Sequence, residues 1–352
     1  MNTNASSILE NATQAHASDI FIVAGLPLSY KVNGIIHSEG DRLMPSDTET
    51  LIRGIFALAS DRPIQPFLDC GDDDFSFAIP GLSRFRVSTY KQRGSMAAVI
   101  RVIAFELPNP ADLGIPASVL NLTDLTKGMV LVTGPAGSGK STTLSCLVDR
   151  INSNRQNHII TLEDPLEFLH RHKKSIVSQR EISTDTENYL TALRAALRQS
   201  PDVILLGEMR DHETIQTAMT AAETGHLILS SLHTIGAANT ISRIIDVFPS
   251  VQQPQIALQL SMVLKAVVSQ QLVPSVDGTM IPAFEIMVMT PAISNMIRDS
   301  KTHQIDGMIY SSAKADMISM DSSLLQLYHS GQITAETALH YATNPDMLRK
   351  KL

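Results

Sequence analysis

The chain has 352 residues, of which 43% are hydrophobic, and a formal net charge of −7 at pH 7. This length is enough for two domains with separate hydrophobic cores. The acidic balance argues against a nucleic acid as the main partner, and the only two cysteines, Cys70 and Cys146, exclude a four-Cys zinc site.

The first third of the chain predicts a small α+β domain built on an antiparallel sheet. Alternating or apolar runs predict strands over residues 19–23, 29–36, 72–79, 84–90 and 97–103. Asn33-Gly34 is expected to form a hairpin turn. A short helix is expected over residues 8–17, and Ser46-Asp47 is expected to cap a helix that runs to about Ala59.

Three prolines, Pro108, Pro110 and Pro116, follow these strands. Because proline fixes φ and lacks an N–H donor, we expect an extended linker over residues 104–117. This boundary divides the chain into an N-terminal domain of residues 1–103 and a C-terminal domain of residues 118–352.

The second domain has the pattern of an α/β protein. Short apolar runs alternate with helical stretches, which indicates a parallel sheet covered on both faces. The apolar runs are residues 129–132, 159–162, 203–206 and 227–229. Helices are expected over residues 142–151 and 188–199, and from a cap at Asp211 to Gly225.

The last third of the chain predicts three further features. Residues 252–272 are expected to form one long apolar helix. Residues 273–289 predict a hairpin at the edge of the sheet, with a turn at Asp277-Gly278. The remainder, from Pro291, is expected to be a helical tail.

Residues 134–141, GPAGSGKS, fit the phosphate-binding pattern G-x-x-x-x-G-K-[S/T]. The loop's backbone N–H groups can surround a triphosphate, Lys140 can reach the β- and γ-phosphates, and the Ser141 hydroxyl can ligate Mg²⁺. A predicted strand precedes the loop and a predicted helix follows it, so the helix N-terminus would face the phosphates. The expected nucleotide-binding residues are Gly134, Pro135, Ala136, Gly137, Ser138, Gly139, Lys140, Ser141 and Thr142.

Polar side chains follow three later apolar runs. These are Glu163-Asp164, then Glu208 after Gly207, and then His233. Ligands gather at the carboxyl ends of strands in α/β sheets. If these strands lie beside the strand before the P-loop, the side chains converge on the γ-phosphate and its metal.

The two glutamates are the candidates for catalysis, because phosphoryl transfer requires an oriented water. We assign Glu163 to polarising that water and Glu208 to the water shell of Mg²⁺. The position where many P-loop proteins have an Asp is Gly207 here, and the division of labour between the two glutamates stays open. The alternative is that each carboxylate caps a following helix.

Histidines and arginines add further candidates. His233, and with less support His226, can sense the γ-phosphate through a hydrogen bond, although a lone His is more often structural. In ring ATPases the transition-state charge is often met by a neighbour's arginine. Arg86 and Arg101 are the best candidates for this task. The other arginines considered, each more typical of a surface ion pair, are Arg84, Arg93, Arg194, Arg198 and Arg210.

Together these residues resemble the PilT-type ATPases of type IV pilus twitching motility, within the secretion ATPase superfamily. The resemblance rests on residues 134–143 (Walker A), 161–168 (Asp box), 206–211 (Walker B) and 224–234 (His box). Residues 17–19, 25–27 and 84–87 of the first domain match as well. The resemblance covers nearly the whole chain.

The resemblance implies a PAS-like N-terminal domain and a RecA-like ATPase domain with a helical C-terminal region. It implies a homohexameric ring that uses ATP and Mg²⁺ and couples ATP turnover to domain rotation during pilus retraction. Each site would lie between one subunit's P-loop and first-domain arginines. The ring would dock on the inner-membrane platform protein of the pilus machinery.

The sequence also gives an expectation for location. Residues 1–7 are polar and lack a secretory signal, and no run approaches the roughly 18 apolar residues of a membrane span. We therefore expect a cytoplasmic protein, peripheral to the inner face of the cytoplasmic membrane, with no nucleic acid as partner.

One departure bears on the function. The family's retraction signature, A-I-R-N-L-I-R-E, is replaced at residues 292–299 by AISNMIRD, with Ser294 for Arg and Asp299 for Glu. This weakens the case for retraction relative to ATPase activity. The alternatives are an accessory or type II/IV secretion ATPase, a nucleic-acid motor with a RecA core, and a non-hydrolysing regulator, which conflicts with the two glutamates.

Overall fold

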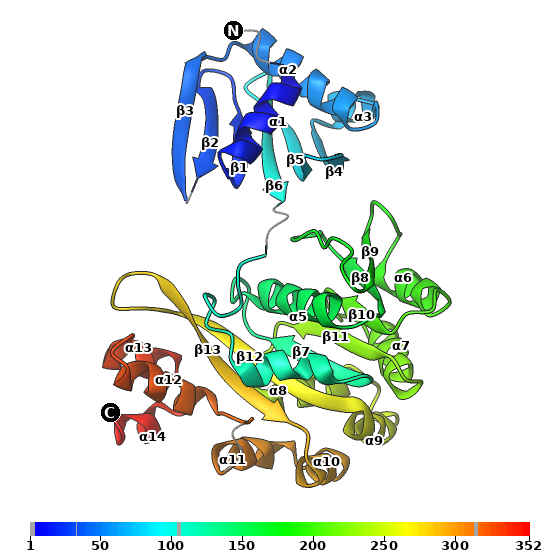
Figure 1. Ribbon diagram of the computed structural model, residues 1–352, viewed down its shortest axis with the longest axis vertical. Helices are drawn as coiled ribbons and strands as arrows, with labels where there is room; N and C mark the ends of the chain where they lie inside the picture. Colours follow the sequence, from blue (N-terminus) through cyan, green and yellow to red (C-terminus); the bar gives the residue numbers. More distant parts are fainter. Residues whose placement is uncertain (1–3, 33, 104–106, 313–315) are drawn as a thin grey trace. The chain divides into compact units, whose positions relative to one another are not determined.

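The computed structural model describes residues 4–32, 34–103, 107–312 and 316–352. The chain divides into two compact units (Figure 1). The first contains residues up to 106 together with 167–169, and the second contains 107–166 and 170–352. Residues 107–116 form neither helix nor strand. The linker over 104–117 stays a prediction, because residues 104–106 lie outside the described residues.

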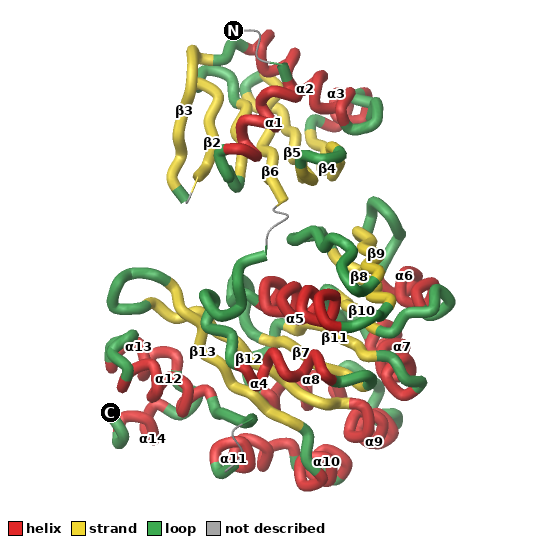
Figure 2. Tube along the Cα trace, in the orientation of Figure 1, coloured by secondary structure: helices red, strands yellow, loops and turns green. Residues whose placement is uncertain are grey.

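The N-terminal unit is an antiparallel sheet of six strands in the order β3-β2-β1-β6-β5-β4. The strands are β1 (Asp19–Ile22), β2 (Pro27–Val32), β3 (Ile35–Arg42), β4 (Asp72–Ile79), β5 (Ser83–Gln92) and β6 (Ser95–Ile103). Three helices, α1 (Ala5–Gln14), α2 (Pro45–Leu58) and α3 (Gln65–Cys70), pack with the sheet (Figure 2). Their shared core includes Leu9, Ile52, Phe56 and Phe85.

The predicted α+β character of this unit is confirmed, with local corrections. The run over 29–36, in which a turn was expected at Asn33-Gly34, forms two paired strands, since β2 ends at Val32 and β3 begins at Ile35; Asn33 itself lies outside the described residues. Helix α2 has Met44 as its N-cap, and the Asp47 carboxylate accepts a hydrogen bond from the Met44 N–H at 2.7 Å. Asp47 is therefore the reciprocal partner of the cap and not the cap itself.

The second unit contains a seven-stranded sheet in the order β13-β12-β7-β11-β10-β8-β9. The strands are β7 (Gly128–Thr133), β8 (His158–Glu163), β9 (Ile176–Glu181), β10 (Val203–Leu206), β11 (Leu227–Leu232), β12 (Leu264–Pro274) and β13 (Met280–Val288). All neighbours pair in parallel except β13, which is antiparallel to β12. This confirms the predicted α/β pattern.

Helices cover both faces of this sheet. Their bounds are α4 (Ala117–Leu120), α5 (Lys140–Asn154), α6 (Tyr189–Ala196), α7 (His212–Glu223), α8 (Ala237–Asp246), α9 (Gln253–Val263), α10 (Pro291–Arg298), α11 (Ile305–Tyr310), α12 (Met320–His329), α13 (Ala335–Tyr341) and α14 (Pro345–Arg349). Along β7, Met129 and Leu131 belong to one core while Val130 and Val132 belong to another. Burial on both faces explains why residues 129–132 of this strand are all apolar.

The helix predicted over 252–272 is wrong in its second half. Helix α9 ends at Val263, and β12 begins at Leu264 and runs through the rest. Strand β12 lies between β7 and β13 and is buried on both faces, so its side chains show no period of two that would identify a strand. The predicted hairpin turn near Gly278 is correct, and β13 lies at the edge of the sheet.

None of the helices in the described residues is long and apolar enough to cross a lipid bilayer.

Candidate nucleotide site

The P-loop connects β7 to α5, and close packing requires glycine at two of its positions. Gly134 has a φ of 143° and Gly139 a φ of 85°. A Cβ on Gly134 would lie 2.1 Å from the carbonyl oxygen of Gln270, and one on Gly139 would lie 2.9 Å from the Gln270 Nε2. Because Gln270 lies on β12, the neighbouring strand holds the loop from one side.

The side chains of the loop are arranged for an anion. The Lys140 ammonium is buried and donates hydrogen bonds to the carbonyl oxygens of Gly134, at 3.0 Å, and Pro135, at 2.8 Å. The buried Ser138 hydroxyl has no hydrogen-bond partner in the described part of the chain. A buried hydroxyl without a partner is costly, so this group fits an acceptor such as a phosphate oxygen. Ser141 and Thr142 follow in the first turn of α5.

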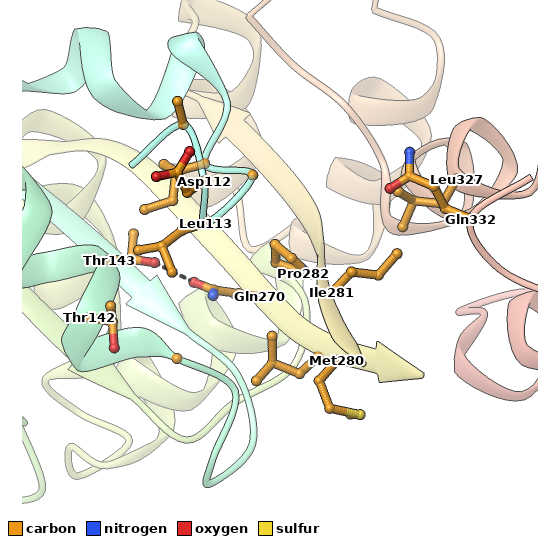
Figure 3. A pocket seen from close by; sticks show the side chains of 15 residues that line it. Asp112, Leu113, Thr142, Thr143, Gln270, Met280, Ile281, Pro282, Leu327 and Gln332 are labelled. Atoms are coloured by element: carbon orange, nitrogen blue, oxygen red, sulfur yellow. Dashed lines mark hydrogen bonds between the residues drawn. The ribbon is translucent and has the colours of Figure 1, made fainter. Parts of the chain in front are cut away.

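A cavity of about 620 Å³ adjoins the start of α5 (Figure 3). It is lined by Gly139, Thr142 and Thr143, by the β12–β13 hairpin, by residues 111–115, and by Leu327 and Gln332 near the C-terminus. The Thr143 hydroxyl donates to the Gln270 Oε1 at 2.7 Å, the dashed contact in Figure 3. The cavity is large enough for a base and a ribose.

The strand ends bring the predicted side chains to one edge of the sheet. In register, Leu206 of β10 lies opposite Leu162 of β8 and Ser230 of β11, and Leu232 lies opposite Thr133 of β7. The residues that follow, Glu163, Glu208, His233 and the P-loop, therefore share this edge. Since parallel strands point the same way, these groups come from separate segments of the chain but lie at one edge of the sheet.

Glu208 contacts an arginine and a histidine. Its side chain is only 13% exposed; Oε1 lies 2.6 Å from a guanidinium nitrogen of Arg210, and Oε2 lies 3.7 Å from the His233 Nε2. Glu163 is buried, and its Oε1 lies 3.5 Å from the Gln179 Nε2 of β9. The helix-cap alternative does not hold for Glu208, because Asp211 is the N-cap of α7. It does not hold for Glu163 either, because β9 follows before the next helix.

Other predicted residues lie elsewhere. His226 precedes β11 at its amino end, the opposite edge of the sheet, and its Nδ1 lies 2.9 Å from the Ala221 carbonyl oxygen at the end of α7. The expectation that His226 faces the γ-phosphate of its own chain is therefore wrong. Arg194 lies 3.5 Å from Glu213 on the exterior.

Arg86 and Arg101 belong to the N-terminal unit and lie directly opposite each other on β5 and β6. Neighbouring side chains Phe85, Val87 and Ile100 are buried, so the two arginines lie on the other face of this sheet. The Arg101 side chain is 66% exposed, and its Nε lies 3.2 Å from Asp19. The structure brings the two arginines together as a pair.

The sequence interpretation missed Gln270 and Tyr189. Gln270 is nearly fully buried beside the P-loop, and the signal for it was a polar Gln-Gln pair inside an apolar run. The Tyr189 hydroxyl lies 2.7 Å from where a Cβ on Gly207 would lie. An Asp at position 207 would collide with this hydroxyl, which accounts for the glycine there.

Comparison with known proteins identifies the family. The family described as type II/IV secretion system protein matches residues 2–304. The Pseudomonas aeruginosa protein named type IV pilus retractation ATPase PilT is 41% identical over 96% of this chain and 98% of its own length. The Pseudomonas aeruginosa type IV pilus ATPase PilU is 37% identical over 97% of this chain and 89% of its own length.

A crystal structure of the pilus retraction motor PilT with bound ADP has a TM-score of 0.90 and 42% identity, covering 99% of this chain and 100% of that one. These matches confirm the predicted resemblance and the fold of an N-terminal α+β domain followed by a RecA-like domain. The chain belongs to the type II/IV secretion system protein family and is an ATPase that uses a nucleotide.

Proposed function

We propose that this chain powers retraction of type IV pili by coupling ATP turnover to domain rotation. The observation that carries the proposal is the 41% identity to the retraction ATPase PilT, which extends over 96% of this chain and 98% of that relative. The stretch that aligns with PilT covers both units and every nucleotide motif. It therefore supports a shared task as well as a shared fold.

The P-loop and the adjoining cavity bind ATP in this proposal. Backbone N–H groups of residues 136–142 and the Ser138 hydroxyl bind the phosphates, and Lys140 exchanges its carbonyl partners for phosphate oxygens. Charge-assisted hydrogen bonds to phosphate are stronger than those to neutral carbonyls. The base and ribose occupy the cavity of about 620 Å³.

Two side chains of this chain would hold magnesium beside the nucleotide. The Ser141 hydroxyl would be the direct protein ligand, and Glu208 would bind through the metal's water shell. The donor set fits Mg²⁺, which prefers oxygen ligands and retains several waters. When bound, the ion neutralises charge on the phosphates.

Hydrolysis is assigned to the side chains at the ends of the strands. Glu163, buried and oriented by Gln179, polarises the attacking water, and Glu208 is held by Arg210 and His233. In this proposal His233, whose Nε2 lies 3.7 Å from Glu208, senses the γ-phosphate through a hydrogen bond. The protein's main contribution is positioning and charge neutralisation.

The working assembly in this proposal is a homohexameric ring closed by heterologous contacts. Arg86 and Arg101, paired across β5 and β6, act on the P-loop of a neighbouring subunit. The ring lies in the cytoplasm at the inner face of the membrane and docks on the pilus platform protein. The net charge of −7 supports a protein partner over a nucleic acid.

A second candidate function is an accessory pilus ATPase that acts beside another motor. Two observations favour it: the 37% identity to PilU, and the altered signature at residues 292–299. Ser294 donates a hydrogen bond to the Ser261 carbonyl of α9 at 3.0 Å. It thus joins α10 to α9, whereas the arginine of the signature would carry a charge there.

The two functions separate in a count of surface pili. A strain lacking this gene would be complemented with the wild type, with Lys140→Ala, or with the exposed control Lys127→Ala. Retraction predicts excess, immobile pili in the deletion strain and with Lys140→Ala, and normal pili with the control. Unchanged pili in the deletion strain would overturn retraction in favour of the accessory or secretion function, and bare cells would indicate assembly.

A further inference from the structure

Tyr189 reaches the ends of two strands at the nucleotide edge of the sheet. It is the first residue of α6, and Asn188 fixes this start by accepting a hydrogen bond from the Thr191 N–H at 2.9 Å. A Cβ built on Gly207 would lie 2.7 Å from the Tyr189 hydroxyl and 3.3 Å from the Leu162 carbonyl oxygen. The hydroxyl thus lies beside the residue that immediately precedes Glu208.

Gly207 is explained by this contact and not by its backbone. Its φ lies outside the left-handed region that favours glycine, so an L side chain would not be strained by conformation there. What excludes a side chain is space, and the nearest atom that occupies the space is the phenol oxygen. Gly207 and Tyr189 are therefore complementary.

The surroundings of the hydroxyl are acidic. Burial raises the pKa of Tyr189 well above its usual range, and the carboxylates of Glu208, Asp164 and Glu163 raise it further, while Arg210 opposes them. The phenol is therefore protonated under cellular conditions. Next to carboxylates, a protonated phenol is a hydrogen-bond donor.

We propose that Tyr189 is a positioning residue for ATP hydrolysis, whose hydroxyl donates a hydrogen bond to the Glu208 carboxylate in the working site. A guanidinium nitrogen of Arg210 lies 2.6 Å from one Glu208 oxygen, and the His233 Nε2 lies 3.7 Å from the other. The Tyr189 hydroxyl adds a donor from a different element, α6. The aromatic ring packs against the neighbouring core, so the ring stabilises the fold while the hydroxyl acts on the site. This inference rests on the proposed role of Glu208.

The variant Tyr189→Phe tests the hydroxyl alone, because the ring and its packing remain. We expect unchanged nucleotide affinity, measured with a fluorescent ATP analogue, an unchanged melting temperature, and a kcat lower by about tenfold, the size of one hydrogen bond to a charged group. The matched control is Tyr328→Phe on α12, which removes a hydroxyl away from the strand ends and is expected to turn over ATP at the wild-type rate.

The kinetic constants separate positioning from a general structural effect. In Tyr189→Phe, kcat should fall while the KM for ATP and the melting temperature stay at their wild-type values, because the hydroxyl acts on Glu208 and not on nucleotide binding or on the fold. A wild-type kcat would overturn the inference, and so would a parallel loss of kcat, ATP affinity and melting temperature.

Two further variants keep the test decisive. Glu208→Gln should be slow, and adding Tyr189→Phe to it should cause little further loss, because both act through one carboxylate. If Glu208→Gln is slow but Tyr189→Phe matches the wild type, only the role of Tyr189 is overturned. If both variants match the wild type, the proposed role of Glu208 is overturned as well.

Gly207→Ala tests the contact between residue 207 and the Tyr189 hydroxyl. It should lower the stability of the wild type more than it lowers the stability of Tyr189→Phe, and equal losses would contradict this contact.

Discussion

Lys140 illustrates how single residues define this site. Its ammonium is buried, and the carbonyl oxygens of Gly134 and Pro135 accept hydrogen bonds from it at 3.0 and 2.8 Å. A buried cation that donates hydrogen bonds to neutral carbonyls is stabilised when phosphate oxygens replace them. Hydrogen bonds between opposite charges are stronger than those between a charge and a neutral group. The loop therefore holds a charge in position for a triphosphate.

Replacing Lys140 with Ala is expected to abolish ATP turnover, since no other side chain of the loop carries a positive charge. The measurement is phosphate release by the purified protein, with Lys127→Ala as the control for loss of an exposed lysine. ATP turnover equal to that of the wild type would mean that the site has been assigned to the wrong loop.

Glu208 gives a second prediction at this scale. Glu208→Gln keeps the shape of the side chain but removes the charge, so the variant should bind ATP and hydrolyse it at least about tenfold more slowly, or about 1.4 kcal/mol of barrier. The lost pair with Arg210 should cost little stability, because the Arg210 side chain is 77% exposed. A rate within about twofold of wild type would remove Glu208 from the mechanism.

At the scale of elements, the sequence was most informative where local rules decide the structure. The P-loop between β7 and α5, the Asp211 cap of α7 and the turn near Gly278 follow from residues close together in the chain. Strand β12 could not be distinguished from a helix because burial on both faces removes the alternation. Gln270 beside the P-loop was missed for the same reason, since its contact depends on the pairing of β12 with β7.

Glu285 on β13 connects two helix N-termini. Its carboxylate accepts hydrogen bonds from the Ala237 N–H of α8 at 2.8 Å and from the Met320 N–H of α12 at 3.5 Å. Burial raises the pKa of Glu285 above its usual 4.5, and the charges of Asp306 and Asp321 raise it further, against the hydrogen bonds from Ala237 and Met320. The folded protein therefore binds this proton more tightly than the unfolded chain does.

We therefore expect the contribution of Glu285 to the free energy of unfolding to fall as the pH rises. Above the unfolded pKa, near 4.5, the unfolded chain releases the proton first, so the contribution of protonated Glu285 is lost as pH rises through the folded pKa. The melting temperature of Glu285→Gln relative to wild type should increase from about pH 4.5 toward neutrality. Glu336→Gln, at an exposed position of α13, is the control. A difference that stays constant or shrinks with pH would contradict this.

At the scale of the whole molecule, the candidate residues are divided between two units that each have a core of their own. The P-loop and the strand-end carboxylates belong to the second unit, and Arg86 and Arg101 belong to the first. In the proposed ring, heterologous contacts present one subunit's surface to a different surface of its neighbour. The arginine pair would then complete a site on another chain, as arginines do in ring ATPases.

Mixed rings test this arrangement. Lys140→Ala lacks a working P-loop, and the double variant Arg86→Ala with Arg101→Ala lacks the arginine pair, so each should be inactive alone. If the arginines act on the neighbour, rings assembled by co-expression of both variants contain intact interfaces wherever a subunit with Lys140 faces a subunit with both arginines. Random mixing makes that about a quarter of the interfaces.

The recovered activity distinguishes the two arrangements because a site built within one chain cannot be repaired by mixing. Arginines that act in trans predict phosphate release well above the sum of the two separate variants, together with native mass spectra of mixed hexamers. Mixed hexamers with no recovered activity would place the arginines outside the neighbour's site. Losing Arg101 should leave the fold intact, because the Arg101 side chain that pairs with Asp19 is 66% exposed and exposed ion pairs contribute little stability. Inactivity of the arginine variant would therefore reflect the missing charge.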